Sequence, residues 1–83
     1  MPRFQHRPVI VEAEQFLPDR QNAAHWPDGV ERIGFDWVFR NAGQRAYVIV
    51  PGDWIIAGNL GERYPLSDEV FRAAYEPVPV EGS

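Results

Sequence analysis

The sequence predicts an α+β domain: a small, strongly bent antiparallel sheet of about five strands, partly barrel-like, with one C-terminal helix. Short segments of alternating apolar residues predict the strands, and Pro and Gly pairs between them predict tight turns. A serine followed by two acidic residues and an apolar stripe predicts the helix. With 83 residues, the chain is expected to form one domain over residues 1–78, followed by a flexible tail over residues 79–83.

The first strand is expected over residues 8–16, where Val11 and Ala13 fall on one face and Glu12 and Glu14 on the other. Two carboxylates on one face could serve acid–base catalysis, but a solvated edge is the interpretation we favour. A proline ends this strand, because it cannot donate to a ladder.

The next segment allows a short helix over residues 20–26, which Pro27 would break. The clearest strand pattern of the chain follows over residues 31–40. One face of this strand is expected to carry Ile33, Phe35, Trp37 and Phe39.

A hairpin loop with a bulge is expected at residues 41–44, because Asn41 and Gly43 both tolerate positive φ. The return strand is expected over residues 45–50. It places Tyr47 and Ile49 on one face and Val48 and Val50 on the other.

Residues 51–77 carry the densest local signals of the chain. Pro51-Gly52 is typical of a type II turn, in which Gly takes positive φ. Asp53 could be read as a catalytic acid, but we favour a carboxylate that bonds neighbouring backbone N–H groups and locks the turn. A strand over residues 54–57 is expected to follow, and then a turn that uses Gly58 and Gly61.

A short edge strand is expected over residues 62–64 and should stop at Pro65. Ser67 is a good N-cap, and the acidic residues after it favour the positive end of the helix dipole. The apolar stripe of this helix is expected to consist of Val70, Phe71, Ala74 and Tyr75, and Pro77 should end the element.

Composition excludes several classes of protein. The net charge of −4 disfavours direct binding to DNA or RNA polymers, which needs a basic face. Cysteine is absent and there are two histidines, so we expect no disulfide, metal site or cofactor. No catalytic residue is identified, and the chain is not expected to be an enzyme. Its basic N-terminus lacks the apolar run of a signal peptide, and no membrane association is expected.

All eight basic residues are arginine. A GC-rich genome explains this bias simply, whereas recognition of planar anions would explain it functionally. If arginines and aromatic residues of adjacent strands share a face, they could hold a base and a phosphate or a partner protein. The candidate ligand-binding residues are Arg40, Arg45, Trp54, Arg63 and Tyr64. The alternative is that the tryptophans are core and the arginines are solvated.

Motifs at both ends resemble a family of small phage and prophage proteins. The opening Arg7-Pro8-Val9-Ile10-Val11-Glu12-Ala13 is similar to that family's KPVVIEAVQF start. The later part is similar to its GDWII, GEFYP and IFExTYEPV motifs through Pro51-Gly52-Asp53-Trp54-Ile55-Ile56, Gly61-Glu62-Arg63-Tyr64-Pro65 and Val70-Phe71 to Val78. Arg63 and Leu66 depart from that pattern, where members carry an aromatic residue and a cysteine.

The resemblance implies a phage-encoded accessory protein located in the host cytoplasm, with no activity to carry over. Two functions remain open. One is a non-enzymatic binder of a host protein or a small anionic ligand such as a nucleotide-type defence signal. The other is a structural or assembly module of the phage particle. Either function could use a homo-oligomer, because a chain of 83 residues has a small core.

Overall fold

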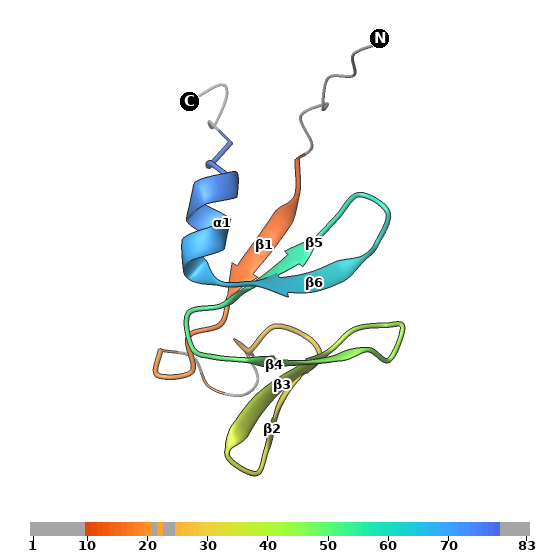
Figure 1. The fold of residues 1–83 in the computed structure, drawn as a ribbon, viewed down its shortest axis with the longest axis vertical. Coiled ribbons are helices and arrows are strands. Elements are labelled where there is room, and N and C mark those ends of the chain that lie inside the picture. Colours follow the sequence, from red (N-terminus) through yellow and green to blue (C-terminus); the bar gives the residue numbers. More distant parts are fainter. Residues whose placement is uncertain (1–9, 21, 23–24, 79–83) are drawn as a thin grey trace, which may run out of the picture.

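Six strands and one helix form in the described residues, and the strands make two separate antiparallel sheets (Figure 1). The structure, a computed structural model, describes residues 10–20, 22 and 25–78. One sheet has the order β1-β5-β6, and its strands are β1 (Glu12–Gln15), β5 (Trp54–Ala57) and β6 (Arg63–Leu66). The other has the order β2-β3-β4, from β2 (Val30–Ile33), β3 (Asp36–Arg40) and β4 (Ala46–Ile49). The helix α1 (Asp68–Ala74) follows β6.

The antiparallel strands and the C-terminal helix confirm the expected class in its coarse form. The expected single bent sheet of about five strands, partly closed like a barrel, is wrong. The chain instead splits its strands between two sheets of three strands each.

The expected single strand over residues 31–40 is also wrong, because the chain reverses in its middle. Ile33 pairs with Asp36, so Gly34 and Phe35 form a two-residue hairpin loop between β2 and β3. Gly34 has φ 62°, the positive value that the first loop position of a type II′ turn requires. Phe35 therefore lies at the hairpin tip, 95% exposed, and not on the apolar face where the alternation placed it.

The loop between β3 and β4 has the expected bulged form, but positive φ occurs at neither expected residue. The Asn41 N–H donates to the carbonyl of Arg45, and the Gln44 N–H donates to the carbonyl of Asn41. These bonds describe a type I turn followed by one left-handed residue, which is Gln44 at φ 65°. The Asn41 side-chain oxygen accepts from the Arg45 N–H. Asn41 therefore stabilises the loop by this hydrogen bond and not by adopting positive φ.

The corner after β4 connects the two sheets. The Asp53 N–H donates to the Val50 carbonyl, and Gly52 has φ 98°, which gives the geometry of a type II turn. The Asp53 carboxylate accepts from the Val50 N–H at 3.0 Å and closes this turn a second time. Phe16 bonds through both backbone groups to Gly52 and Asp53, so β1 is attached to the corner directly.

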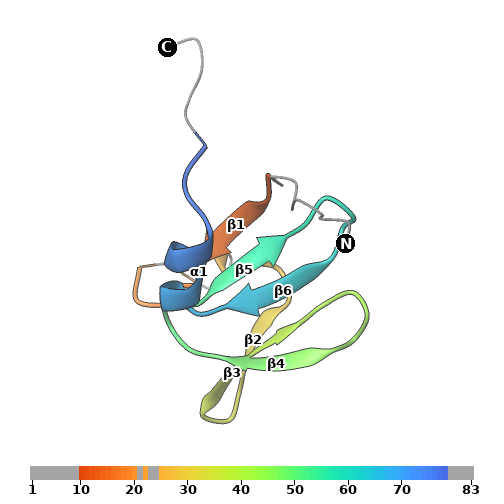
Figure 2. The ribbon, with the colours of Figure 1, turned by 45° about the horizontal axis from the view of Figure 1, so that its top comes forward.

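Three layers result: α1, sheet β1-β5-β6 and sheet β2-β3-β4 (Figures 1 and 2). Consecutive residues of β5 point to opposite faces, and both are buried: Ile55 is 2% and Ile56 0% exposed. Ile55 joins Phe16, Phe39 and Ile49 in the core between the sheets. Partly buried residues complete that core: Trp26, Val30, Trp37 and Tyr47.

β6 does not stop at Pro65 as expected, because the strand continues to Leu66. Pro65 lies opposite Ile55 on an edge strand. The missing N–H of a proline is tolerated there, since it can point to the unpaired side.

The helix begins as its sequence suggests. The Ser67 hydroxyl accepts from the Val70 N–H at 3.2 Å, and two acidic residues occupy the first turn. Only half of the expected apolar stripe packs against the rest of the chain: Phe71 and Tyr75 are partly buried, whereas Val70 and Ala74 are exposed.

Some expectations fall outside the described residues. The short helix over residues 20–26 includes residues 21, 23 and 24, and the first strand was expected to include residues 8 and 9. In the described part, the Arg20 N–H donates to Leu17 and the His25 N–H to Asn22. The tail over residues 79–83 also lies outside the described residues.

Candidate functional site

The structure does not bring the five candidate ligand-binding residues together. Trp54 and Tyr64 lie on the face of sheet β1-β5-β6 that α1 covers. Arg63 lies on the opposite face, because neighbouring strand residues alternate. Arg40 and Arg45 belong to the other sheet and its loop. A site that combines arginines and aromatic rings around one anion is therefore not formed by this set.

Two of these arginines are engaged within the chain. The Arg63 guanidinium donates to the Asp28 carbonyl at 2.9 Å and lies 5.1 Å from the centre of the Phe39 ring. The Arg45 guanidinium lies 5.7 Å from the centre of the Tyr47 ring. In both contacts the guanidinium packs over an aromatic ring at the edge of the core.

Three stacked aromatic rings join α1 to the sheet. The Trp54 and Phe71 rings lie 4.1 Å apart at 16°, and the Phe71 and Tyr75 rings lie 5.3 Å apart at 21°. Phe71 and Tyr75 are neighbours because residues four apart share a helix face. The stack is a continuous aromatic wall along the inner side of α1.

Asp68 holds the first ring of this wall. Its Oδ1 accepts from the Trp54 indole N–H at 2.8 Å and from the Arg72 Nε at 2.9 Å. The hydrogen bond from Trp54, and then the bond and charge of Arg72, lower the pKa of the Asp68 carboxyl below its ordinary 3.8. Asp68 is therefore ionised at neutral pH and sets the orientation of the indole.

An open, mostly apolar groove of about 300 Å³ runs between the start of β1 and the end of α1. The aromatic wall forms one side, and the first residues of the described chain form the other. Two of its lining residues are strongly exposed: Ile10 at 73% and Val78 at 60%. The groove is lined by Ile10, Val11, Ala13, Trp54, Phe71, Tyr75, Glu76, Pro77 and Val78.

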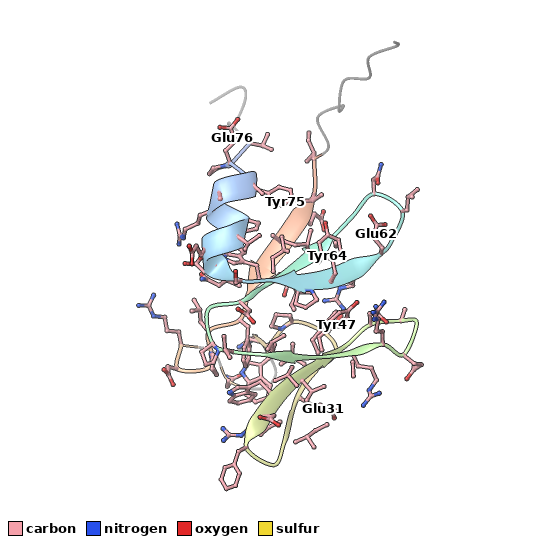
Figure 3. All side chains as sticks on the ribbon, viewed as in Figure 1. Glu31, Tyr47, Glu62, Tyr64, Tyr75 and Glu76 are labelled. Atoms are coloured by element: carbon pink, nitrogen blue, oxygen red, sulfur yellow. The ribbon has the colours of Figure 1, made fainter. Side chains whose placement is uncertain are left out.

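Tyr75, which lines the groove, pairs through its hydroxyl with Tyr64 on β6, which does not. Figure 3 shows Tyr64 and Tyr75 pointing toward one another between β6 and α1, and their oxygens are 3.3 Å apart. This hydrogen bond, with burial and the neighbouring Tyr75 and Glu62, raises the pKa of Tyr64 from 10.0 to about 12. Among the described lining residues, Glu76 is the one carboxylate, and no cationic side chain lines the groove.

Sequence reasoning named Trp54 and Tyr64 but missed the groove beside them. Its signals were present, since Val11 and Ala13 were placed on one strand face and Phe71 and Tyr75 on one helix face. The groove forms because the strand face and the helix face lie side by side, and neither sequence pattern specifies this long-range contact.

A second groove, of about 290 Å³, lies on the other face of sheet β1-β5-β6 and is lined in part by Glu12, Glu14 and Arg63. Its two carboxylates are exposed, as the solvated-edge interpretation expects. In the described parts of the chain, no three His, Cys, Asp or Glu side chains gather where they could hold a metal ion. The apolar groove is the better candidate, because aromatic and aliphatic side chains make up most of its lining.

Searches against protein-family models, curated proteins and solved structures found no match to this chain. Within the described residues, the single helix is too short to cross a bilayer.

Proposed function

We propose that this chain is a small phage-encoded accessory protein that acts by binding a host protein in the host cytoplasm, without catalysis. The observation that supports this proposal is the groove between β1 and α1, whose wall is the stack of Trp54, Phe71 and Tyr75. Rigid aromatic surfaces next to exposed aliphatic side chains are typical of protein-binding sites.

A protein segment suits this groove better than a nucleotide. A nucleotide would need arginines or backbone N–H groups aimed at its phosphates. The charged lining residue is instead Glu76, and Arg40, Arg45 and Arg63 lie on other faces. The expected ligand is a segment with an aromatic or branched apolar side chain, followed by a lysine or arginine that can approach Glu76.

Selection from a displayed peptide library tests this proposal. Selected peptides should share the apolar-then-basic pattern, and they should shift the Trp54 indole N–H resonance, because the Trp54 side chain lines the groove and its N–H reports on the hydrogen bond to Asp68. Ile10→Asp should weaken binding by about tenfold or more, since it places a carboxylate on the apolar rim. The matched control is Val48→Asp, an equally exposed valine on the other sheet at 70% exposure.

Two results would contradict the proposal. One is selected peptides that bind equally well to the wild type and to Ile10→Asp. The other is a cyclic nucleotide that raises the melting temperature and shifts the resonances of Arg40, Arg45 or Arg63, because this would favour the nucleotide signal as the ligand.

The alternative, a structural or assembly module of the phage particle, is favoured by a different observation. Sheet β2-β3-β4 exposes several large apolar side chains, among them Phe35 and Val48, that a single copy leaves uncovered in the described residues. Mass spectrometry of purified virions separates the two functions, because an assembly module is present in stoichiometric amounts.

A further inference from the structure

The outer face of sheet β2-β3-β4 is apolar at its centre. Val38 lies on the middle strand, directly opposite Glu31 on β2 and Val48 on β4. Side chains opposite one another in an antiparallel sheet share a face. Ile49 points into the core at 2% exposure, so Val48 and Val50 on either side of it point outward, at 70% and 59%.

Ile33 adds to this face from β2 and is 49% exposed. Its partner Asp36 has the same orientation, next to Val38 on the middle strand. Ile33, Val38, Val48 and Val50 form an apolar strip in which Val38, at the centre, is 8% exposed and the other three residues are exposed. Apolar patches rimmed by polar residues mark interaction sites.

Charges flank the strip in a self-complementary order. Along β3 the outward residues are Asp36, Val38 and Arg40, which read acidic, apolar and basic. The structure gives neither Asp36 nor Arg40 an ion-pair partner among the described residues. A half-turn about an axis that lies between two stacked sheets, parallel to them and perpendicular to β3 above Val38, brings Asp36 opposite Arg40 of the second copy, and the reverse.

We propose that this face binds a second copy of the same chain, with the two sheets stacked and the two-fold axis lying between them, perpendicular to β3 and above Val38. Val48 of both copies, at 70% exposure, then supplies most of the apolar contact beside the largely covered Val38, and two Asp36–Arg40 ion pairs form the rim. Glu31 also points outward near the axis. It faces Glu31 of the second copy at the exposed edge of the sheet, and repulsion between the two carboxylates weakens association. This surface is separate from the groove between β1 and α1 and does not depend on its function.

The size of the face sets the expected strength. Three strands and the five residues of β3 span about 15 Å by 17 Å. Stable interfaces bury about 800 Å² on each partner, so this dimer is weak and forms at micromolar or higher concentrations.

Sedimentation velocity from about 10 µM to about 1 mM tests the proposal over the range where weak interfaces associate. The wild type should shift from monomer to dimer with concentration. Asp36→Arg should weaken association about tenfold or more, because it opposes like charges, and so should Arg40→Asp. The double variant, Asp36→Arg with Arg40→Asp, should recover to within about threefold of the wild type, because the charges are exchanged and still complementary.

Val48→Asp should abolish association, whereas Ile10→Asp and Leu60→Asp, at exposed apolar residues elsewhere, should leave it unchanged. Circular dichroism checks that each variant is folded. A wild type that stays monomeric throughout would overturn the proposal. So would a double variant that dimerises no better than the single variants, or a dimer that Ile10→Asp dissociates.

Discussion

Sheet β1-β5-β6 is covered on both faces, whereas sheet β2-β3-β4 is covered on one face by the described chain. The difference is visible in single strands. Ile55 and Ile56 are adjacent on β5 and both are buried, but on β4 Ile49 is buried and its neighbour Val48 is exposed. Because all four side chains are aliphatic, burial here is decided by which layers the fold supplies and not by residue type. The comparison shows that the second sheet keeps aliphatic side chains exposed on its outer face, where the described chain supplies no further layer.

The largest expected effect compares the two sheets through truncation of a branched side chain in each. Ile56→Ala should lower the free energy of unfolding by about 3 to 4 kcal/mol, because it removes buried methyl groups and leaves a cavity under α1. Val48→Ala should change it by less than about 0.5 kcal/mol, since the valine is exposed in the monomer. Urea denaturation at low protein concentration measures both, and similar losses would contradict the difference in cover.

A smaller effect is expected at the edge where the second sheet begins. Gly29 has φ 89°, and a Cβ there would lie 2.5 Å from the Arg40 carbonyl oxygen. Gly29→Ala should therefore destabilise the protein by about 2 to 3 kcal/mol. The matched control is Gly34→Ala, where φ is also positive but no atom lies within 4 Å of the added Cβ. It should cost about 1 kcal/mol, and equal losses would show that close approach at Gly29 is unimportant.

The smallest effect concerns the helix that covers the first sheet, and it depends on pH. The pKa of Asp68 is lowered in the folded state, so its contribution to stability is present above the ordinary value of 3.8 and is lost as pH falls below it. Between neutral pH and about pH 3, the urea midpoint of the wild type should fall more than that of Asp68→Asn. Glu69→Gln, which removes a charge from the same turn without touching Trp54, should keep the wild-type fall. An equal fall in wild type and Asp68→Asn would contradict the role of the Trp54 and Arg72 contacts.

Local signals predicted local structure well. The strand over residues 54–57, the turn at Pro51-Gly52 and the helix start at Ser67 all depend on neighbouring residues, and the structure has each at its expected place. The hairpin at Gly34 was missed because Ile33 and Phe35 continued the alternation through it. A glycine that turns the chain and a glycine within a strand look alike when the apolar period is uninterrupted.

The candidate site was less accessible to sequence reasoning. Trp54 and Tyr64 were identified from their strands, but their partners Phe71 and Tyr75 come from the helix, and their meeting depends on which face of the sheet α1 covers. The arginines were expected near these rings because they are close in sequence. Side chains alternate between the two faces of a strand. Arg63 therefore lies on the opposite face of the sheet from Tyr64, although the two residues are adjacent in sequence.

By itself the sequence determined the kind of most elements, the turn at Pro51-Gly52, the cap at Ser67 and the absence of thiol chemistry, because these depend on residue type or on residues within a few positions of one another. The tertiary structure alone decided that the strands divide into two sheets, which faces are covered, and where the groove and the exposed strip lie. Those features depend on contacts between segments far apart in the chain, such as Phe16 with Asp53 and Trp54 with Phe71. A local pattern does not specify such contacts, because it shows which face of an element is apolar but not which distant segment packs against that face.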